Sequence, residues 1–227
     1  MEPSPQQIQS NFADIKPALT LDHALIEANR CLYCYDAPCT IACPTHINVP
    51  EFIRRIGSKN LVGAAETILD SNILGASCAR VCPTQELCEG ACVFHDLEMP
   101  PIDIGRLQRF ATDHVMNHDI KVFEAPPQQN KGSVAIVGAG PAGLACAAEL
   151  GLLGYKAVVL DDKAEPGGLN RYGIAPYKLT NEEALDEVKY IQNMCQFEIR
   201  NNTRVGRDVS FQQLEQEYDA IFLGVGL

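Results

Sequence analysis

Eight of the ten cysteines in this 227-residue chain fall between positions 31 and 92, in two dense runs. A chain that gathers so many thiols in one region either cross-links them or uses them to bind metal. Disulfides are rare in the cytosol, and the N-terminus lacks the basic stretch and apolar core of a signal peptide. The two runs therefore indicate a metal-binding region. They are Cys31-x2-Cys34-x4-Cys39-x3-Cys43-Pro44 and Cys78-x3-Cys82-Pro83-x4-Cys88-x3-Cys92.

The spacing within each run favours iron–sulfur clusters. Three closely spaced thiolates can wrap one [4Fe–4S] cube, and in two-cluster proteins the cysteine before a proline ligates the other cube. Pro44 fixes its own φ and restricts Cys43, so it turns the chain away after that cysteine. We therefore predict two cubes that exchange one cysteine in each direction. Zinc is an alternative, although its sites usually take two C-x2–4-C pairs. Cys146 and Cys195 lie outside the runs and are predicted to be buried apolar residues.

Charge and hydropathy exclude two classes of partner. The formal net charge is −11, which would repel a phosphate backbone, so we expect no nucleic-acid binding. The charge-free stretch 132–148 is shorter than the ~20 residues of a membrane helix and is interrupted by glycine and proline. We expect a soluble, cytoplasmic protein with an apolar fraction, 46%, large enough to form a core.

The chain divides into a helical part and an α/β part. Helix starts are predicted at Asn48, at Asn60 and near Asp103, with the cysteines in the loops between helices. A polar, proline-containing stretch then precedes a buried strand, a glycine turn, a helix and a second buried strand, which together predict a βαβ unit. The predicted helical domain, linker and Rossmann-like domain are residues 1–123, 124–132 and 133–227.

The turn of the βαβ unit is a G-x-G-x-x-G sequence formed by Gly138, Gly140 and Gly143. Such glycines allow a tight turn and a close approach of the backbone to a pyrophosphate at a helix N-terminus. Asp161 ends the next strand, where an acid binds a ribose hydroxyl, and the neighbouring Asp162 could share that role. These features predict a dinucleotide site rather than a plain glycine-rich loop.

Three more segments carry a resemblance to a known family: "GAGPAGL", "GGLNRYGIAPYKL" and "YDAIFLGVG". Together with the cysteine runs, they resemble the FAD/iron–sulfur family that contains the glutamate synthase small subunit and dihydropyrimidine dehydrogenase. "GASCARVCPTQELCEGAC" and "PIDIGRLQRFATD" look closest to the NADH-oxidising subunit of the bacterial dihydropyrimidine dehydrogenase, because Gln108 stands where the glutamate synthase subunit has glutamate. The resemblance implies an α-helical domain with two [4Fe–4S] clusters, followed by an α/β Rossmann-like FAD-binding domain.

The resemblance also implies which residues hold each cofactor. One cluster would be held by Cys31, Cys34, Cys39 and Cys92, and the other by Cys43, Cys82, Cys88 and the amide oxygen of Gln108. The residues at the FAD pyrophosphate would be Gly138, Gly140, Pro141, Ala142 and Gly143, and Asp161 would bind the ribose. Gly168 and Leu169 would lie beneath the flavin, and Lys178 would be a basic residue near FAD. Val205 would approach the adenine, and Val81 would reach the flavin from the cluster domain.

The eighth cluster ligand is the point at which counting and resemblance disagree. Eight cysteines would make two all-thiolate sites if Cys78 were a ligand, and thiolate is the ligand that iron–sulfur clusters normally take. The resemblance instead assigns Gln108 and leaves Cys78 a buried spectator. We follow the resemblance.

By the same resemblance, electrons would pass from NAD(P)H through FAD and the two clusters to a flavin-carrying partner subunit that reduces the 5,6 double bond of uracil or thymine. This implies a hetero-oligomer, with no catalytic residue for pyrimidine chemistry in this chain. The alternatives are a glutamate synthase small subunit and an iron–sulfur docking module without flavin chemistry. In the family a nicotinamide-binding domain follows "FLGVG", so we expect an incomplete FAD domain and no NADH turnover by these 227 residues alone.

Overall fold

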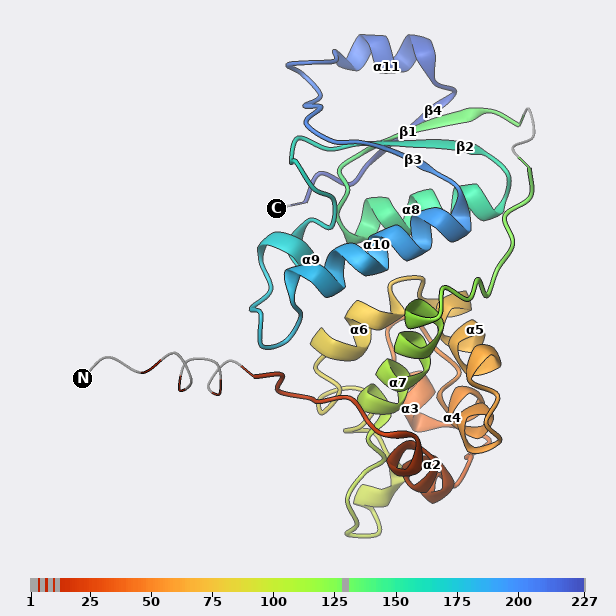
Figure 1. Ribbon diagram of the computed structural model, residues 1–227. Helices are drawn as coiled ribbons and strands as arrows, with labels where there is room; N and C mark the ends of the chain where they lie inside the picture. Colours follow the sequence, from red (N-terminus) through yellow and green to blue (C-terminus); the bar gives the residue numbers. More distant parts are fainter. Residues whose placement is uncertain (1–3, 5–6, 8–9, 11–12, 128–130, 227) are drawn as a thin grey trace. The chain divides into compact units, whose positions relative to one another are not determined.

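The structure is a computed structural model that describes residues 4, 7, 10, 13–127 and 131–226 (Figure 1). The chain forms two compact units, each made of two separate stretches of sequence. A helical unit comprises Met1–Val115 and Ile174–Asn181, and an α/β unit comprises Met116–Gly173 and Glu182–Leu227. The domain boundaries at residues 123 and 132 were inferred from the composition of the sequence, and they stay predictions. Part of the expected linker, residues 128–130, lies outside the described residues.

Asparagine side chains start two helices of the helical unit where the sequence predicts them. Asn48 Oδ1 accepts a hydrogen bond from the Glu51 N–H at 3.2 Å, and Asn60 Oδ1 accepts one from the Gly63 N–H at 3.0 Å. The third predicted start, near Asp103, is also confirmed. The elements are α2 (Leu21–Arg30), α3 (Pro38–Ile41), α4 (Val49–Gly57), α5 (Leu61–Ser71), α6 (Gly75–Val81), the 3-10 helix η1 (Val93–His95) and α7 (Ile104–Asn117).

The expectation that all the cysteines lie in loops is wrong for two of them. Cys39 lies in the four-residue helix α3 and Cys78 in the seven-residue helix α6. Helices this short are not stable by themselves, so tertiary packing must hold them. In α6, for example, most residues from Gly75 to Arg80 are buried.

The core of the helical unit brings the cysteines to its margin. Apolar side chains of α2, α4, α5 and α7 form one buried cluster, with Phe52, Ile53 and Leu107 fully buried. Cysteines from both runs pack against this cluster. The four helices therefore act as a rigid frame around which the cysteine-bearing turns are folded.

The α/β unit contains a parallel sheet with strand order β3-β2-β1-β4. Helices α8 and α10 lie on one side of this sheet and α11 on the other (Figure 1). The central strands are apolar because both faces are covered, and β2 buries four of its five residues. The elements are β1 (Ser133–Val137), α8 (Pro141–Leu152), β2 (Lys156–Leu160), α9 (Leu169–Tyr172), α10 (Asn181–Cys195), β3 (Glu198–Arg200), α11 (Phe211–Glu217) and β4 (Ala220–Leu223).

The segment FEIRNNTRV (residues 197–205) predicts a strand that ends at Val205, but the observed strand is shorter. β3 stops at Arg200, and Asn202 then adopts a positive φ of 53° in a turn. Val205 forms only an isolated bridge with Val209. The two asparagines at 201 and 202 favour a turn over a strand, which explains the early end. No helix within the described residues is both long enough and apolar enough to span a membrane.

Candidate functional site

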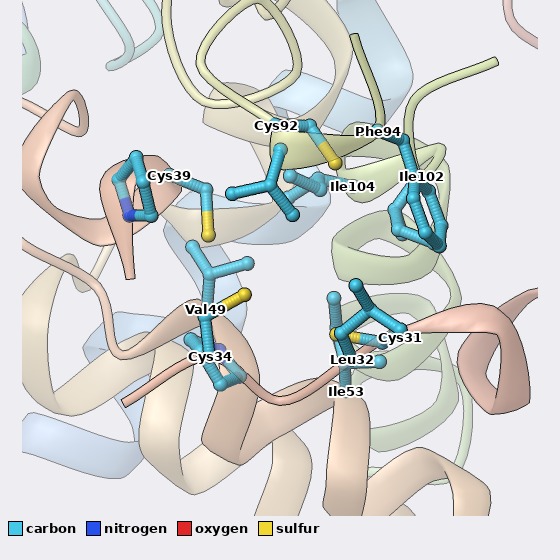
Figure 2. A pocket seen from close by; sticks show the side chains of 13 residues that line it. Cys31, Leu32, Cys34, Cys39, Val49, Ile53, Cys92, Phe94, Ile102 and Ile104 are labelled. Carbon is cyan, nitrogen blue, oxygen red and sulfur yellow. The ribbon is translucent and has the colours of Figure 1, made fainter. Parts of the chain in front are cut away.

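Four cysteines from separate segments surround one cavity in the helical unit. Cys31 follows α2, Cys34 lies in the next loop, Cys39 lies in α3, and Cys92 precedes η1. Figure 2 shows their sulfur atoms turned toward the same space. The rest of the lining is apolar and comes from Leu32, Pro38, Val49, Pro50, Ile53, Val93, Phe94, Ile102 and Ile104. The structure thus brings Cys92 of the second run to three cysteines of the first.

Burial disfavours ionisation of two of these thiols, those of Cys31 and Cys39. It raises the pKa of Cys39 to about 11, and the neighbouring Cys31 and Cys92 add to the rise. Burial also raises the pKa of Cys31, again with contributions from Cys34 and Cys92. The thiols are therefore close enough to repel one another when ionised, in surroundings that exclude water. A bound cationic iron–sulfur core would offset that repulsion.

A second group of thiols forms around α6. Cys78 and Cys82 are hydrogen-bonded to each other, and this bond lowers the pKa of Cys82 to about 7. Burial raises the pKa of Cys88 to about 12, with smaller contributions from the nearby Glu89, Cys82 and Cys43. Cys43 of the first run is therefore within electrostatic range of Cys88 of the second run.

Gln108 reaches this second group from α7. Its side chain is buried, with 6% exposed, and Nε2 donates a hydrogen bond to the Gly75 carbonyl of α6 at 2.8 Å. Gln108 also hydrogen-bonds the Cys78 side chain. Of the two candidates for the eighth ligand, Cys78 is hydrogen-bonded to Cys82 and Gln108 is hydrogen-bonded to Cys78, and their roles stay predictions.

Both sets of side chains fit an iron–sulfur cube by their donor chemistry. In the part of the chain that the structure describes, no three His, Cys, Asp or Glu side chains converge on a point suited to one metal ion. A cube spreads its four ligands over four iron atoms, so its ligands need only surround a common space. The thiols around the cavity of Figure 2 do so.

The glycine turn of the α/β unit is built by close backbone contacts. A Cβ on Gly143 would lie 1.9 Å from the Gly138 carbonyl oxygen, and Gly138 itself has a φ of 104°. Pro141 starts α8 at a position where no N–H is needed. The turn therefore requires glycine at both positions and leaves the N-terminus of α8 at the carboxyl edge of the sheet.

The segment that follows β2 returns to this turn. The Gly167 N–H donates to the Ala139 carbonyl at 2.8 Å, and Gly168 has a φ of 52°. A Cβ on Gly168 would lie 2.6 Å from the Cα of Gly140. Leu169 then begins α9 and is exposed. The predicted residues Gly140, Ala142, Gly168 and Leu169 therefore belong to one local structure.

A cavity of about 300 Å³ lies at the carboxyl ends of β1 and β2. Asp161 lines this cavity, and its carboxylate accepts hydrogen bonds from the Ala139 N–H at 2.6 Å and the Lys163 N–H at 2.8 Å. Asp161 thus fixes the glycine turn, a role that the sequence analysis missed. The lining residues are Val137, Gly138, Leu160, Asp161, Asp162, Thr203, Arg204, Val205 and Val225.

Thr203 and Arg204 were also missed, although they line this cavity. The asparagine pair at 201 and 202 marks the end of the third strand, and Thr203 and Arg204 follow it directly. Because ligands bind at the carboxyl ends of parallel strands, this position could have identified both residues. Val81 at the end of α6 and Lys178 before α10 both belong to the helical unit. Their predicted contacts with the flavin remain untested.

Two families match successive parts of the chain. Residues 8–120 match dihydropyrimidine dehydrogenase domain II, 4Fe-4S cluster. Residues 136–174 match the NAD(P)-binding Rossmann-like domain. The matches agree with the predicted order of a helical iron–sulfur region followed by a Rossmann-like region.

Curated relatives match almost the whole chain. The NAD-dependent dihydropyrimidine dehydrogenase subunit PreT of Salmonella typhimurium is 42% identical over 96% of this chain and 52% of its own length. PreT of Escherichia coli K12 is 43% identical over 96% of this chain and 53% of its own length. The glutamate synthase [NADPH] small chain of Escherichia coli K12 is 38% identical over 95% of this chain and 45% of its own length. The chain thus spans about half the length of these relatives.

Among solved structures, 6-hydroxypseudooxynicotine amine oxidase from Pseudomonas geniculata N1 aligns at a TM-score of 0.36 with 17% identity, over 84% of this chain and 24% of its own. That likeness is too distant to bear on the fold or the site. The two family matches and the high identity to PreT agree with the geometry of the thiols and of the glycine turn. The chain therefore belongs to the family of iron–sulfur oxidoreductase subunits that includes dihydropyrimidine dehydrogenase subunit PreT and the glutamate synthase small chain.

Proposed function

We propose that this chain belongs to an electron-transfer subunit that carries electrons from NAD(P)H, by way of FAD and two [4Fe–4S] clusters, to a flavin-containing partner subunit. That partner would reduce uracil or thymine to the 5,6-dihydropyrimidine. The observation that carries the electron-transfer role is the ring of four thiols, Cys31, Cys34, Cys39 and Cys92, around one apolar cavity. The choice of pyrimidine substrates rests on the higher identity to PreT, 42–43%, than to the glutamate synthase small chain, 38%.

The cofactors would supply the redox chemistry, because a flavin exchanges electrons in pairs or singly and an iron–sulfur cube exchanges them singly. The chain's own residues bind and shield them. The cysteine thiols lose their protons on binding, and the apolar walls of Val49, Ile53 and Ile104 exclude water from the first site. The turn at Gly138 and Gly140 would let the backbone approach the pyrophosphate, at the N-terminus of α8.

Two clusters rather than one are proposed because the thiols form two groups. Cys43 and Cys82 both lie near enough to Cys88 to disfavour its ionisation and so raise its pKa, and Cys31, Cys34, Cys39 and Cys92 line a separate cavity. Gln108 supplies the eighth donor in this proposal. We propose a cytoplasmic hetero-oligomer, since thiol-bound clusters persist where thiols are kept reduced.

Anaerobic purification is expected to yield about eight iron atoms and eight inorganic sulfides per chain. The physical reason is that seven thiolates and one amide suffice for two cubes. Iron and sulfide assays, with zinc measured in the same sample, check this. Cys146→Ala is the matched control, because it removes a cysteine outside both groups and should leave the iron content unchanged. About four irons, or one zinc per site, would contradict two cubes.

Replacing Asp161 by alanine is expected to weaken FAD binding by at least about tenfold, since the glycine turn loses a carboxylate that fixes the Ala139 N–H. Fluorescence titration of flavin against the purified chain measures the change. Asp186→Ala removes the same charge from an exposed position on α10, outside the cavity, and is expected to bind FAD as the unaltered chain does. Equal loss in both variants would mean that net charge, rather than the contact of Asp161, matters.

Co-purification from the native cell tests the function as a whole. The protein is tagged, its partner is identified, and the complex is assayed for NADH-dependent reduction of uracil. Uracil reduction supports the proposal. Formation of glutamate from glutamine and 2-oxoglutarate would instead support a glutamate synthase small subunit. An iron-loaded complex whose visible spectrum lacks resolved flavin bands would support a docking module without flavin chemistry.

A further inference from the structure

A short segment ahead of α2 is fastened to α7 within the helical unit. Arg106 Nε donates to the Pro17 carbonyl at 2.8 Å, and Arg109 Nη1 donates to the Lys16 carbonyl at 2.7 Å. Arg109 also forms an ion pair with Asp14. The backbone of Lys16 is therefore held by contacts on both sides of it.

The side chain of Lys16 is directed to the second group of thiols. Its Nζ donates a hydrogen bond to the Thr84 hydroxyl at 2.8 Å, and Thr84 is buried, with 3% exposed. The Thr84 N–H in turn donates to the Cys82 carbonyl at 2.8 Å. The ammonium group is thus held on a residue that is itself bonded to Cys82.

Two hydrogen bonds through Thr84 connect the ammonium group to Cys82. Lys16 Nζ lies 2.8 Å from the Thr84 hydroxyl oxygen, and the Thr84 backbone nitrogen lies 2.8 Å from the Cys82 carbonyl oxygen. Lys16 therefore places a positive charge within electrostatic range of the thiolate that is proposed to bind iron.

The carboxylate of Glu89 is a negative charge close to Cys82 that a cation at Thr84 would offset. Its side chain is buried, with Oε2 accepting the Thr84 hydroxyl at 2.8 Å and Oε1 accepting the Gly105 N–H at 2.9 Å. A buried carboxylate next to a cluster disfavours addition of an electron. Lys16 reaches the other side of the same threonine, so it balances that charge.

We propose that Lys16 is a positioning residue that makes the cluster of Cys43, Cys82 and Cys88 easier to reduce. The inference rests on the proposed function, because it requires that cluster. Reduction adds one electron and breaks no bond, so the cluster gains one negative charge. A fixed ammonium stabilises the reduced form more than the oxidised form, which favours electron transfer into this cluster.

Anaerobic redox titration of the iron-loaded chain, followed by electron paramagnetic resonance, tests the inference. Lys16→Met is expected to lower the equilibrium constant for one-electron reduction of one cluster by about tenfold and to leave the other cluster unchanged. Lys16→Arg keeps the charge and is expected to restore the original value. Lys59→Met removes one exposed charge from the same unit and is the control for net charge.

Iron content separates failure of this inference from failure of the proposed function. If the unaltered chain holds no clusters, the proposed function fails. If two clusters are present and Lys16→Met shifts neither more than Lys59→Met does, the role of Lys16 is overturned. If Lys16→Met loses iron, Lys16→Gln decides, because it is neutral but retains a hydrogen-bond donor. If the reduction potentials of both clusters in Lys16→Gln equal those of the unaltered chain, the inference is also overturned.

Discussion

Replacing Gly143 by alanine is expected to abolish FAD retention and to destabilise the α/β unit by about 3 kcal/mol or more. The new Cβ would lie 1.9 Å from the Gly138 carbonyl oxygen, a backbone atom. That carbonyl cannot easily move away, because the backbone of Gly138 is packed closely against Gly224. The closeness is shown by the 2.3 Å at which a Cβ on Gly138 would lie from the Gly224 carbonyl oxygen. The start of α8 would therefore have to separate from the turn. Flavin content and urea unfolding followed by circular dichroism measure the two effects.

Gly140→Ala is the matched control, because it changes the same turn without a clash. A Cβ on Gly140 would meet only the Gly168 Cα, at an ordinary 3.9 Å. We expect unfolding within about 1 kcal/mol of the unaltered chain but at least tenfold weaker FAD binding, since glycine here lets the backbone approach the pyrophosphate. Similar unfolding free energies for Gly143→Ala and the unaltered chain would contradict the packing argument.

Local signals in the sequence are sufficient to predict the starts of α4 and α5. Asn48 and Asn60 cap α4 and α5 through their own side chains, so each start depends only on residues three positions apart. The glycine turn is equally local. Its requirement for Gly138 and Gly143 arises from the short path between β1 and α8.

Features that depend on tertiary packing could not be predicted in the same way. Cys39 and Cys78 lie in helices of only four and seven residues. Such helices are too short to show the hydrophobic periodicity from which a helix is predicted. Arg109 looks like a surface residue on α7, yet it is buried with Asp14 and Asp113 as ion-pair partners. The contact of Lys16 with Thr84 joins residues far apart in the chain. Such contacts follow from the folded arrangement rather than from any short motif.

The same limit applies to the eighth cluster ligand, where the sequence offers two candidates that the fold brings together. Cys78 lies on α6 and Gln108 on α7, and the Gln108 Nε2 is bonded to the Gly75 carbonyl of α6. The ion pair of Arg80 with Asp113, at 2.7 Å, joins the same two helices. The amide nitrogen donates to the backbone and carries no lone pair for a metal, so the predicted ligand atom of Gln108 is its amide oxygen.

Cys78→Ala is therefore expected to retain about eight irons per chain, whereas Gln108→Ala is expected to lose about four or to change the spectrum of one cluster. Iron assay and electron paramagnetic resonance of the reduced chain measure both outcomes. A neutral amide in place of a thiolate leaves the cluster one unit less negative, so it favours reduction in the same direction as the ammonium of Lys16. Gln108→Glu restores a negative ligand and should keep the iron while making that cluster harder to reduce. Loss of iron from Cys78→Ala, with Gln108→Ala unaffected, would instead assign the eighth position to the thiolate.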